Sequence, residues 1–260
     1  MYLKIENFNI HYKIINEDLL SQGRTLLVFF HEGLGSISQW KSFPDLLSSK
    51  MNMPALVYDR IGYGESDFWK DREIKSKFLH NEALNIFPSI IKELKITNDI
   101  VLFGHSDGGT IALIHASNPL PQVKAAIIEA PHVFLEEFSL NGIRNARKIL
   151  DNEKIIRLMD RYQQGRAAEL IDKWTAHWLK ANTDDWDAVD ILKRISIPLL
   201  LMQGDKDDFG TFAQIDNVAN SVLSKIVEVH KIDDCGHIPH LQKQEIIMEY
   251  ASEFINSIDN

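Results

Sequence analysis

The chain has 260 residues, of which 45% are hydrophobic and 25% are charged, a composition typical of a globular protein with one large domain. Its formal net charge of -9 disfavours nucleic acids and anionic membranes as partners, because both carry negative charge that an acidic surface repels. The single cysteine, Cys235, can form neither an internal disulfide nor a cysteine metal site. We therefore expect a small-molecule partner, no nucleic acid, no membrane, no metal and no cofactor.

The ends and the hydropathy of the chain bear on where the protein works. The first residues, from Met1 to Phe8, lack the basic start and the apolar core of a signal peptide. No stretch approaches the roughly 18 apolar residues that a membrane span needs. We expect a cytoplasmic protein that is a monomer or a homodimer.

Predicted strands and helices alternate along most of the chain. Residues 2–15 predict two short antiparallel strands with a turn at 7–9. Apolar residues at helical spacing predict a helix over 74–94, which Pro88 should bend or interrupt, and a helical tail follows His240. The remaining predicted strands are 25–30, 55–58, 100–103, 125–128, 197–202 and 226–232. This alternation predicts an α/β fold with a mostly parallel sheet and helices on both faces.

One segment, 132–194, carries no convincing strand. It contains two stretches at helical spacing, 143–162 and 167–180. We therefore divide the chain into a core formed by 1–131 and 195–260 and a helical cap subdomain formed by 132–194.

Three of the five tryptophans, Trp174, Trp178 and Trp186, fall in this cap. Trp174 and Trp178 are an i, i+4 pair on one helical face. Such a pair more often packs a cap against a core than forms a substrate wall. It also fits an apolar pocket under the cap, so Trp174 and Trp178 are candidate pocket residues.

The segment Gly104-His105-Ser106-Asp107-Gly108 lies between a predicted strand and a predicted helix. A chain that reverses sharply there exposes the serine oxygen, and glycines two residues before and after the serine avoid clashes. Gly-X-Ser-X-Gly is by itself a common pentapeptide, but the strand before it and the helix after it favour Ser106 as a nucleophile. His105 fills a position in this turn and is a further candidate for the pocket.

Serine needs a general base, and the base needs a carboxylate that holds it in one tautomer. On this topology both partners should follow the serine in the chain, each at the carboxyl end of a later strand. His237 follows the last strand through Gly236, and we choose it as the base among ten histidines. For His240, three residues on, capping or packing is the simpler explanation. Asp205, Asp207 and Asp208 follow the strand 197–202 and are the candidate acids.

The negative oxygen of a tetrahedral intermediate needs two backbone N–H donors. One usually comes from the residue after the nucleophile, here Asp107, although a carboxylate in the first turn of a helix is also favourable for the helix dipole alone. We assign the second donor to Gly33, in the loop that follows the strand 25–30.

Together these residues resemble the α/β-hydrolase superfamily over nearly the whole chain. The resemblance implies an eight-stranded, mostly parallel sheet with a helical cap after the sixth strand. It also implies that Asp207, in Gly204-X-X-Asp207, is the acid. The motifs in order are His31-Glu32-Gly33-Leu34-Gly35-Ser36, Asp59-Arg60-Ile61-Gly62-Tyr63-Gly64-Glu65-Ser66, Gly104 to Gly109, Gly204-X-X-Asp207 and Gly236-His237.

The sequence departs from the family at Glu32, where glycine is usual. A Glu32 that points into the pocket would disfavour anionic substrates, whereas one that faces solvent or braces its loop would not.

The resemblance is strongest to capped serine esterases and meta-cleavage-product C–C hydrolases, together with haloperoxidase-like members. We expect a serine hydrolase that cleaves a carboxylic ester of a small apolar or acyl substrate. Alternatives are hydrolysis of a C–C bond next to a ketone, cofactor-free haloperoxidase or perhydrolase activity, and an amidase or aminopeptidase role. A hydrolase fold that only binds a ligand normally lacks a triad member, and none is missing here.

Overall fold

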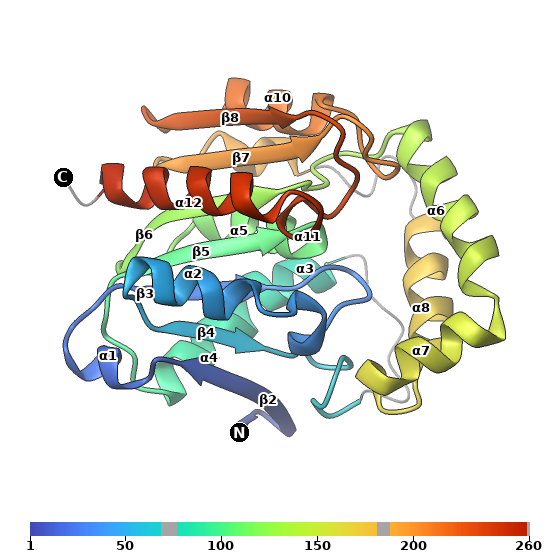
Figure 1. Ribbon diagram of the computed structural model, residues 1–260, viewed down its shortest axis with the longest axis horizontal. Coiled ribbons are helices and arrows are strands. Elements are labelled where there is room, and N and C mark those ends of the chain that lie inside the picture. Colours follow the sequence, from blue (N-terminus) through green and yellow to red (C-terminus); the bar gives the residue numbers. More distant parts are fainter. Residues whose placement is uncertain (69–76, 181–187, 259–260) are drawn as a thin grey trace.

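Six strands form the parallel part of one sheet, and an antiparallel hairpin completes it (Figure 1). The computed structural model describes residues 1–68, 77–180 and 188–258. The eight strands lie in the order β1-β2-β4-β3-β5-β6-β7-β8, and the pairs β1–β2 and β2–β4 are antiparallel. The predicted eight-stranded, mostly parallel sheet is confirmed. The strands are β1 (Tyr2–Ile5), β2 (Phe8–Ile15), β3 (Leu26–Phe30), β4 (Ala55–Tyr58), β5 (Ile100–His105), β6 (Val123–Glu129), β7 (Leu199–Gly204) and β8 (Val227–Ile232).

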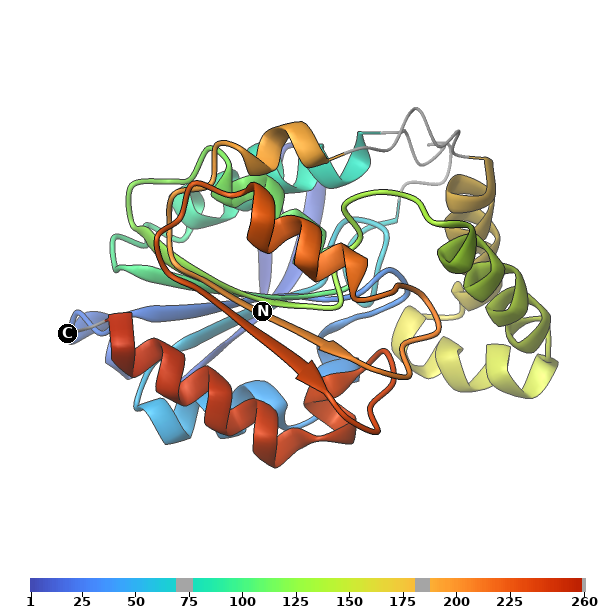
Figure 2. The same ribbon diagram turned by 90° about the horizontal axis from the view of Figure 1, so that it is seen from above.

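Helices cover both faces of the sheet (Figure 2). On one face lie α2, α11 and α12, and on the other lie α3, α4, α5 and α10. The helices are α1 (Asp18–Ser21), α2 (Phe43–Met51), α3 (Phe78–Asn81), α4 (Phe87–Glu93), α5 (Asp107–Ala116), α6 (Glu137–Leu150), α7 (Glu153–Gln163), α8 (Ala167–Lys180), α9 (Val189–Leu192), α10 (Ala213–Ser221), α11 (Pro239–Gln242) and α12 (Gln244–Ile258). A 3-10 helix covers Ile37–Trp40 and a π-helical turn covers Glu82–Ile86.

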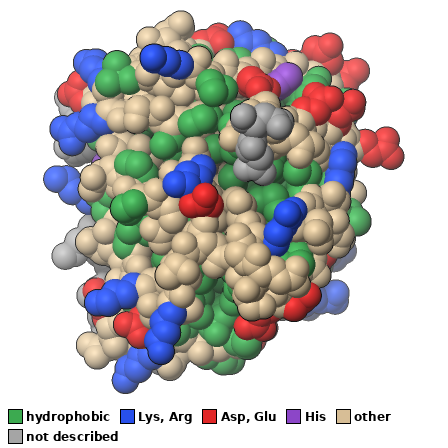
Figure 3. Space-filling model, turned by 90° about the vertical axis from the view of Figure 1, so that its left-hand side faces the viewer, with side chains coloured by type: hydrophobic (Ala, Val, Ile, Leu, Met, Phe, Trp, Pro, Cys, Tyr) green, Lys and Arg blue, Asp and Glu red, His purple; other side chains and the backbone are tan. Residues whose placement is uncertain are grey.

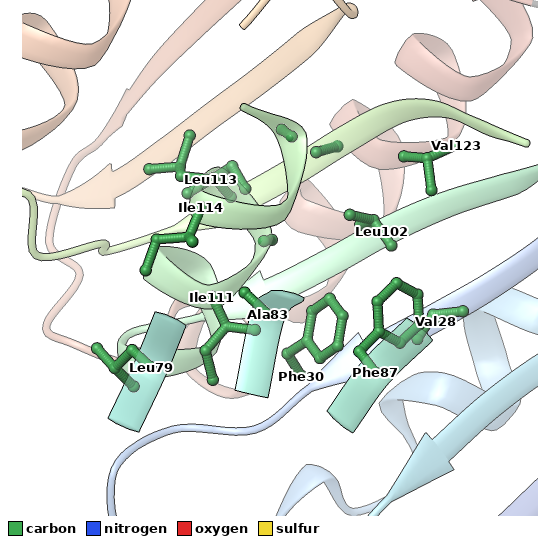
Figure 4. Packing of buried hydrophobic residues seen from close by; sticks show 14 of the residues in the cluster. Val28, Phe30, Leu79, Ala83, Phe87, Leu102, Ile111, Leu113, Ile114 and Val123 are labelled. Atoms are coloured by element: carbon green, nitrogen blue, oxygen red, sulfur yellow. The ribbon is translucent and has the colours of Figure 1, made fainter. Parts of the chain in front are cut away.

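The apolar strand residues alternate between two hydrophobic cores, as the pleat of a strand requires. On the α5 face, Val28, Phe30 and Leu102 pack against α4 and α5 (Figure 4). There the Phe30 and Phe87 rings meet edge to face, with centroids 5.0 Å apart. On the other face, Phe29 and Phe103 belong to the core that α2 and α12 cover. The strands therefore need apolar residues at nearly every position.

Two predicted helices differ from the observed ones. The stretch 143–162 is not one helix but parts of α6 and α7, because Asn152 caps a new helix by accepting a hydrogen bond from the Lys154 N–H at 2.9 Å. In the stretch 74–94, the π-helical turn directly precedes the helix that carries Pro88 in its first turn. Residues 74–76 of that prediction lie outside the described residues.

The helices α6, α7 and α8 follow β6 in the chain and stand beyond the carboxyl ends of the parallel strands (Figures 1 and 2). On the opposite side of the molecule, basic and acidic side chains are interspersed (Figure 3). Among residues 1–68, 77–180 and 188–258, no helix combines the length and the apolar character that crossing a membrane requires.

The contact between α5 and the sheet tests this packing. A Cβ on Gly108 would lie 1.9 Å from the Phe30 carbonyl oxygen, whereas one on the neighbouring Gly109 would lie no closer than 3.1 Å to any atom. We expect Gly108→Ala to destabilise the protein by about 3 kcal/mol, the usual upper range for overpacking, and Gly109→Ala by about 1 kcal/mol or less. Urea unfolding of the two variants measures this difference, and equal stabilities would contradict the packing described.

Candidate active site

Ser106 lies in a sharp turn between β5 and α5. Its backbone has φ 56° and ψ -120°, a strained conformation for a residue with a side chain. A hydrogen bond and the close approach of two stretches of backbone hold it there. The Ser106 N–H donates to the Glu129 carbonyl oxygen at 2.9 Å, and a Cβ on Gly104 would lie 2.2 Å from the Gly108 carbonyl oxygen. The glycines are therefore needed for the turn to close.

A chain of hydrogen bonds joins the three predicted catalytic side chains. His237 Nε2 lies 2.9 Å from Ser106 Oγ, and His237 Nδ1 lies 2.8 Å and 2.9 Å from the two carboxylate oxygens of Asp207. With a proton on Nδ1, the imidazole presents Nε2 as an acceptor to the serine hydroxyl. The structure thus brings Ser106 together with two residues that lie more than a hundred positions later in the chain.

The surroundings of Asp207 distinguish it from the two other candidate acids. Although burial raises its pKa, the interactions with His237 and with the Phe209 N–H, which donates at 2.8 Å, lower it below the ordinary aspartate value. Asp205 instead accepts from the Cys235 N–H at 3.1 Å and shapes a turn, and Asp208 is exposed. Among the three, Asp207 is the carboxylate that contacts His237.

A second imidazole contacts the serine. His132 Nε2 lies 3.4 Å from Ser106 Oγ, and its ring stacks on that of His237 with centroids 5.8 Å apart. Burial, reinforced by the nearby His237, lowers the pKa of His132 to about 3, so its imidazole is neutral at ordinary pH. Sequence reasoning missed His132 as a site residue. The available signal was its place just after β6, where the carboxyl ends of parallel strands gather.

A cavity opens above Ser106. Apolar side chains from α6, α8 and nearby loops form most of its wall, among them Ile143, Trp174, Trp178 and Phe209. The polar residues that line it are Glu32, Ser106, Asp107, His132, Ser139 and His237. The cavity is therefore suited to a mostly apolar molecule whose reactive group meets the serine.

Two of the three candidate pocket residues line the cavity, and the third does not. Trp174 and Trp178 both line the cavity, and Trp174 turns its indole toward Gly33, where an added Cβ would lie 2.2 Å from Nε1. His105 does not line it, which corrects our expectation. As the last residue of β5, it is fully buried behind the site. Trp186 lies outside the described residues.

The two predicted oxyanion donors are neighbours. An added Cβ on Gly33 would lie 2.9 Å from Asp107 Oδ2, so the loop after β3 passes directly beside the start of α5. Asp107 is the first residue of α5, and N–H groups in the first turn have no partner within the helix. Burial raises the pKa of the Asp107 carboxyl to about 6, opposed by Arg60, whose Nη2 lies 3.9 Å from Oδ2.

The fold and this geometry have counterparts among known proteins. The family model described as "Alpha/beta hydrolase family" matches residues 27–249. The chain belongs to this family. The family match and the order of the strands in the sheet both confirm the expected fold.

Named relatives of this α/β hydrolase have more than one activity. A proline iminopeptidase of Saccharolobus solfataricus is 23% identical, over 99% of this chain and 92% of the relative. A Mycoplasma genitalium protein named as a candidate esterase/lipase is 24% identical, over 90% of each chain. The solved meta-cleavage product hydrolase of Pseudomonas fluorescens IP01 superposes with a TM-score of 0.76 at 15% identity, over 99% and 97% of the two chains, and this likeness shows the fold alone.

The presence of two imidazoles at Ser106 gives a test of which one activates it. We expect His237→Phe to lower the rate at which a fluorophosphonate labels Ser106 by more than about a thousandfold, because the proton acceptor is lost. The matched variant His132→Phe removes one weak hydrogen bond and should lower the rate by about threefold to tenfold. Intact-protein mass spectrometry over time measures both rates. A reversed order would make His132 the base.

Proposed function

We propose that this chain is a serine hydrolase that cleaves carboxylic esters of small apolar or acyl substrates through an acyl-enzyme. The observation that carries the proposal is the hydrogen-bonded chain from Asp207 through His237 to Ser106. A serine at the start of a helix, paired with an oriented imidazole, is the arrangement that makes a hydroxyl nucleophilic.

In the first half of the reaction, Ser106 Oγ attacks the ester carbonyl carbon while its proton passes to His237 Nε2. Asp207 keeps the other nitrogen, Nδ1, protonated and stabilises the imidazolium that forms. The C–O bond to the alcohol then breaks, and His237 returns the proton to the departing oxygen. The products are an acyl ester on Ser106 and a free alcohol.

In the second half, a water molecule attacks the acyl carbon and gives its proton to His237. The serine oxygen leaves, takes that proton back, and the carboxylic acid is released. In both tetrahedral intermediates the negative oxygen would accept from the backbone N–H groups of Asp107 and Gly33. The dipole of α5 adds a favourable potential at the same position.

The cavity wall supports the substrate class. Trp174, Trp178, Ile143 and Phe209 offer apolar contacts, and acyl chains gain about 0.8 kcal/mol for each CH2 group that they bury. The Asp107 carboxylate adds negative charge to the polar side, which disfavours a free carboxylate near the reacting carbon. A neutral acyl ester fits both conditions.

A substrate panel tests the proposal. We expect p-nitrophenyl esters of short and medium acyl chains to be hydrolysed, and Ser106→Ala to lose several orders of magnitude in kcat. Asp207→Asn should lose about ten-thousandfold, because the asparagine favours the wrong imidazole tautomer. Asp205→Asn and Asp208→Asn are matched controls that should keep nearly full activity. Turnover of a dienoic C–C substrate without any ester hydrolysis would contradict the ester assignment.

A second candidate function is hydrolysis at the carbonyl of an amino-terminal residue. Relatives named proline iminopeptidase suggest it, and one observation at the site favours it. The Asp107 carboxylate lines the cavity beside the serine, and its Oδ2 accepts no hydrogen bond from the described residues. A protonated amine on the carbon next to the scissile carbonyl would add a hydrogen-bond donor and a second positive charge to this carboxylate, which already has Arg60 Nη2 3.9 Å from Oδ2.

A pair of matched substrates tests this candidate. We expect an alanyl ester to be preferred over the propionyl ester of the same alcohol, and Asp107→Asn to reduce the ratio of their kcat/KM values about tenfold. Because burial raises the pKa of Asp107 to about 6, the preference should grow as the pH rises from about 5 to about 7 and the carboxylate ionises. A ratio that neither the substitution nor the pH alters would exclude this candidate.

A further inference from the structure

A polar cluster, largely buried, lies behind the proposed base, and one of its members, Glu32, also reaches the cavity wall. Its members come from the loop after β3, the ends of β5 and β6, and α11, so four separate segments meet there. They are Glu32, His105, Glu129 and His240. The mechanism above uses none of these side chains.

His105 is the centre of the cluster, with a hydrogen-bonded carbonyl oxygen on one side and a carboxylate at ion-pair distance on the other. Its Nε2 lies 2.6 Å from the main-chain carbonyl oxygen of His237, and its Nδ1 lies 3.9 Å from Glu32 Oε2. A carbonyl oxygen can only accept, so Nε2 must carry a proton. A neutral ring would then turn the lone pair of Nδ1 toward a carboxylate. A ring protonated on both nitrogens would donate to the carbonyl and place its positive charge within ion-pair distance of the carboxylate, and the short distance to the carbonyl fits a charge-assisted bond.

We propose that His105 is a constitutive imidazolium, held by the Glu32 carboxylate, and that it fixes the main chain of His237 so that the base faces Ser106. His105 and Glu32 are then positioning residues. The catalytic consequence rests on the proposed function, whereas the charge state of His105 does not.

The Glu32 side chain is built into this contact. Its carboxylate folds over Gly35, where an added Cβ would lie 2.3 Å from Oε2. Its own main-chain carbonyl accepts from Arg60 Nη2 at 2.7 Å and from His31 Nδ1 at 2.8 Å. The position of the carboxylate is therefore fixed by its loop. Of the two roles considered for Glu32, which replaces the glycine usual in the family, bracing the loop fits this geometry. The side chain also reaches the cavity wall.

Electrostatics support the charged pair. Although burial raises the pKa of Glu32, the interaction with His105 lowers it to about 2. Although burial lowers the pKa of His105, the interactions with Glu32 and Glu129 raise it above the ordinary histidine value. A cation and an anion in this cluster are thus each stabilised by the other.

The second pair of the cluster, His240 and Glu129, is connected to the main chain of Ser106. His240 Nδ1 lies 2.6 Å from Glu129 Oε2, and its ring lies 5.0 Å from that of His105. The Glu129 main-chain oxygen accepts from the Ser106 N–H. The contacts of His240 with Glu129 and with the His105 ring fit a structural role, for which the sequence offered capping or packing. The ionisable groups that surround His105 are Glu32, Asp107, Glu129, His132, His237 and His240.

Nitrogen NMR of histidine-labelled protein tests the charge state directly. At about pH 8, above the ordinary histidine pKa of about 6.5, we expect one imidazole with both ring nitrogens protonated. Its signals should vanish in His105→Gln, which assigns them, and should change to those of a neutral ring in Glu32→Gln. A neutral His105 in the native protein, or an imidazolium that persists unchanged in Glu32→Gln, would overturn the proposal.

Labelling kinetics test the positioning role. The amide nitrogen of Gln can still donate to the His237 carbonyl, so His105→Gln should keep the maximal fluorophosphonate labelling rate within a few-fold. His105→Leu removes the donor and should lower that rate roughly tenfold to hundredfold, with the half-saturating probe concentration unchanged. Circular dichroism and melting curves select variants that are folded. Equal rates for the Leu and Gln variants would overturn the role.

The two arms separate this proposal from the proposed function. If Ser106 in the native protein is not labelled at all, the hydrolase assignment fails while the NMR result stands. If labelling is fast and His105 is neutral, the hydrolase assignment stands and the imidazolium proposal fails.

Discussion

The turn between β5 and α5 is the constraint on which the site depends. With a positive φ at Ser106 and no room for a side chain on Gly104 or Gly108, the chain can reverse within a few residues. That reversal raises the serine oxygen above the carboxyl edge of the sheet. Only from there can it meet an imidazole and a carboxylate that follow β8 and β7. The strain is held by packing on both sides of the helix start, as strained functional residues generally are.

Several polar and ionisable side chains are buried below that turn. His31, His105, Glu129 and Asp107 are each almost completely buried, yet each contacts a charged or hydrogen-bonding partner. Burying such groups is costly unless they are paired. Their combination ties the loop after β3, the serine turn and the histidine loop into one unit. Precise placement of His237 relative to Ser106 is the property that such a unit supplies.

Much of the fold was readable from the sequence because its strands are continuous apolar runs. The predicted strand 25–30 starts one residue before β3 and ends with it, and the predicted strand 55–58 has the same bounds as β4. The boundary between α6 and α7 was not readable, because its signal is one capping residue, Asn152, within a stretch whose apolar spacing continues across it.

The residues of the site likewise fall into those that the sequence identifies and those that it does not. Ser106 and His237 were identifiable because a glycine and a strand precede each of them in a fixed order. Asp207 could be selected among three aspartates only through the family motif, and the structure supplies the physical distinction, since Asp207 is buried against His237. His105 and His132 could not be placed, because spacing along the chain does not say which side of a strand end a side chain occupies. Their opposite locations, behind the base and beside the nucleophile, depend on tertiary packing.

If the proposal is right, Ser106 is a nucleophile only because the folded chain activates it. Peptide mapping after exposure to a fluorophosphonate, in the native state and in denaturant, measures this dependence on folding. We expect a single adduct on Ser106 that forms in the native protein and not in the unfolded chain. No native adduct, or an adduct on another residue with Ser106 unmodified, would contradict it.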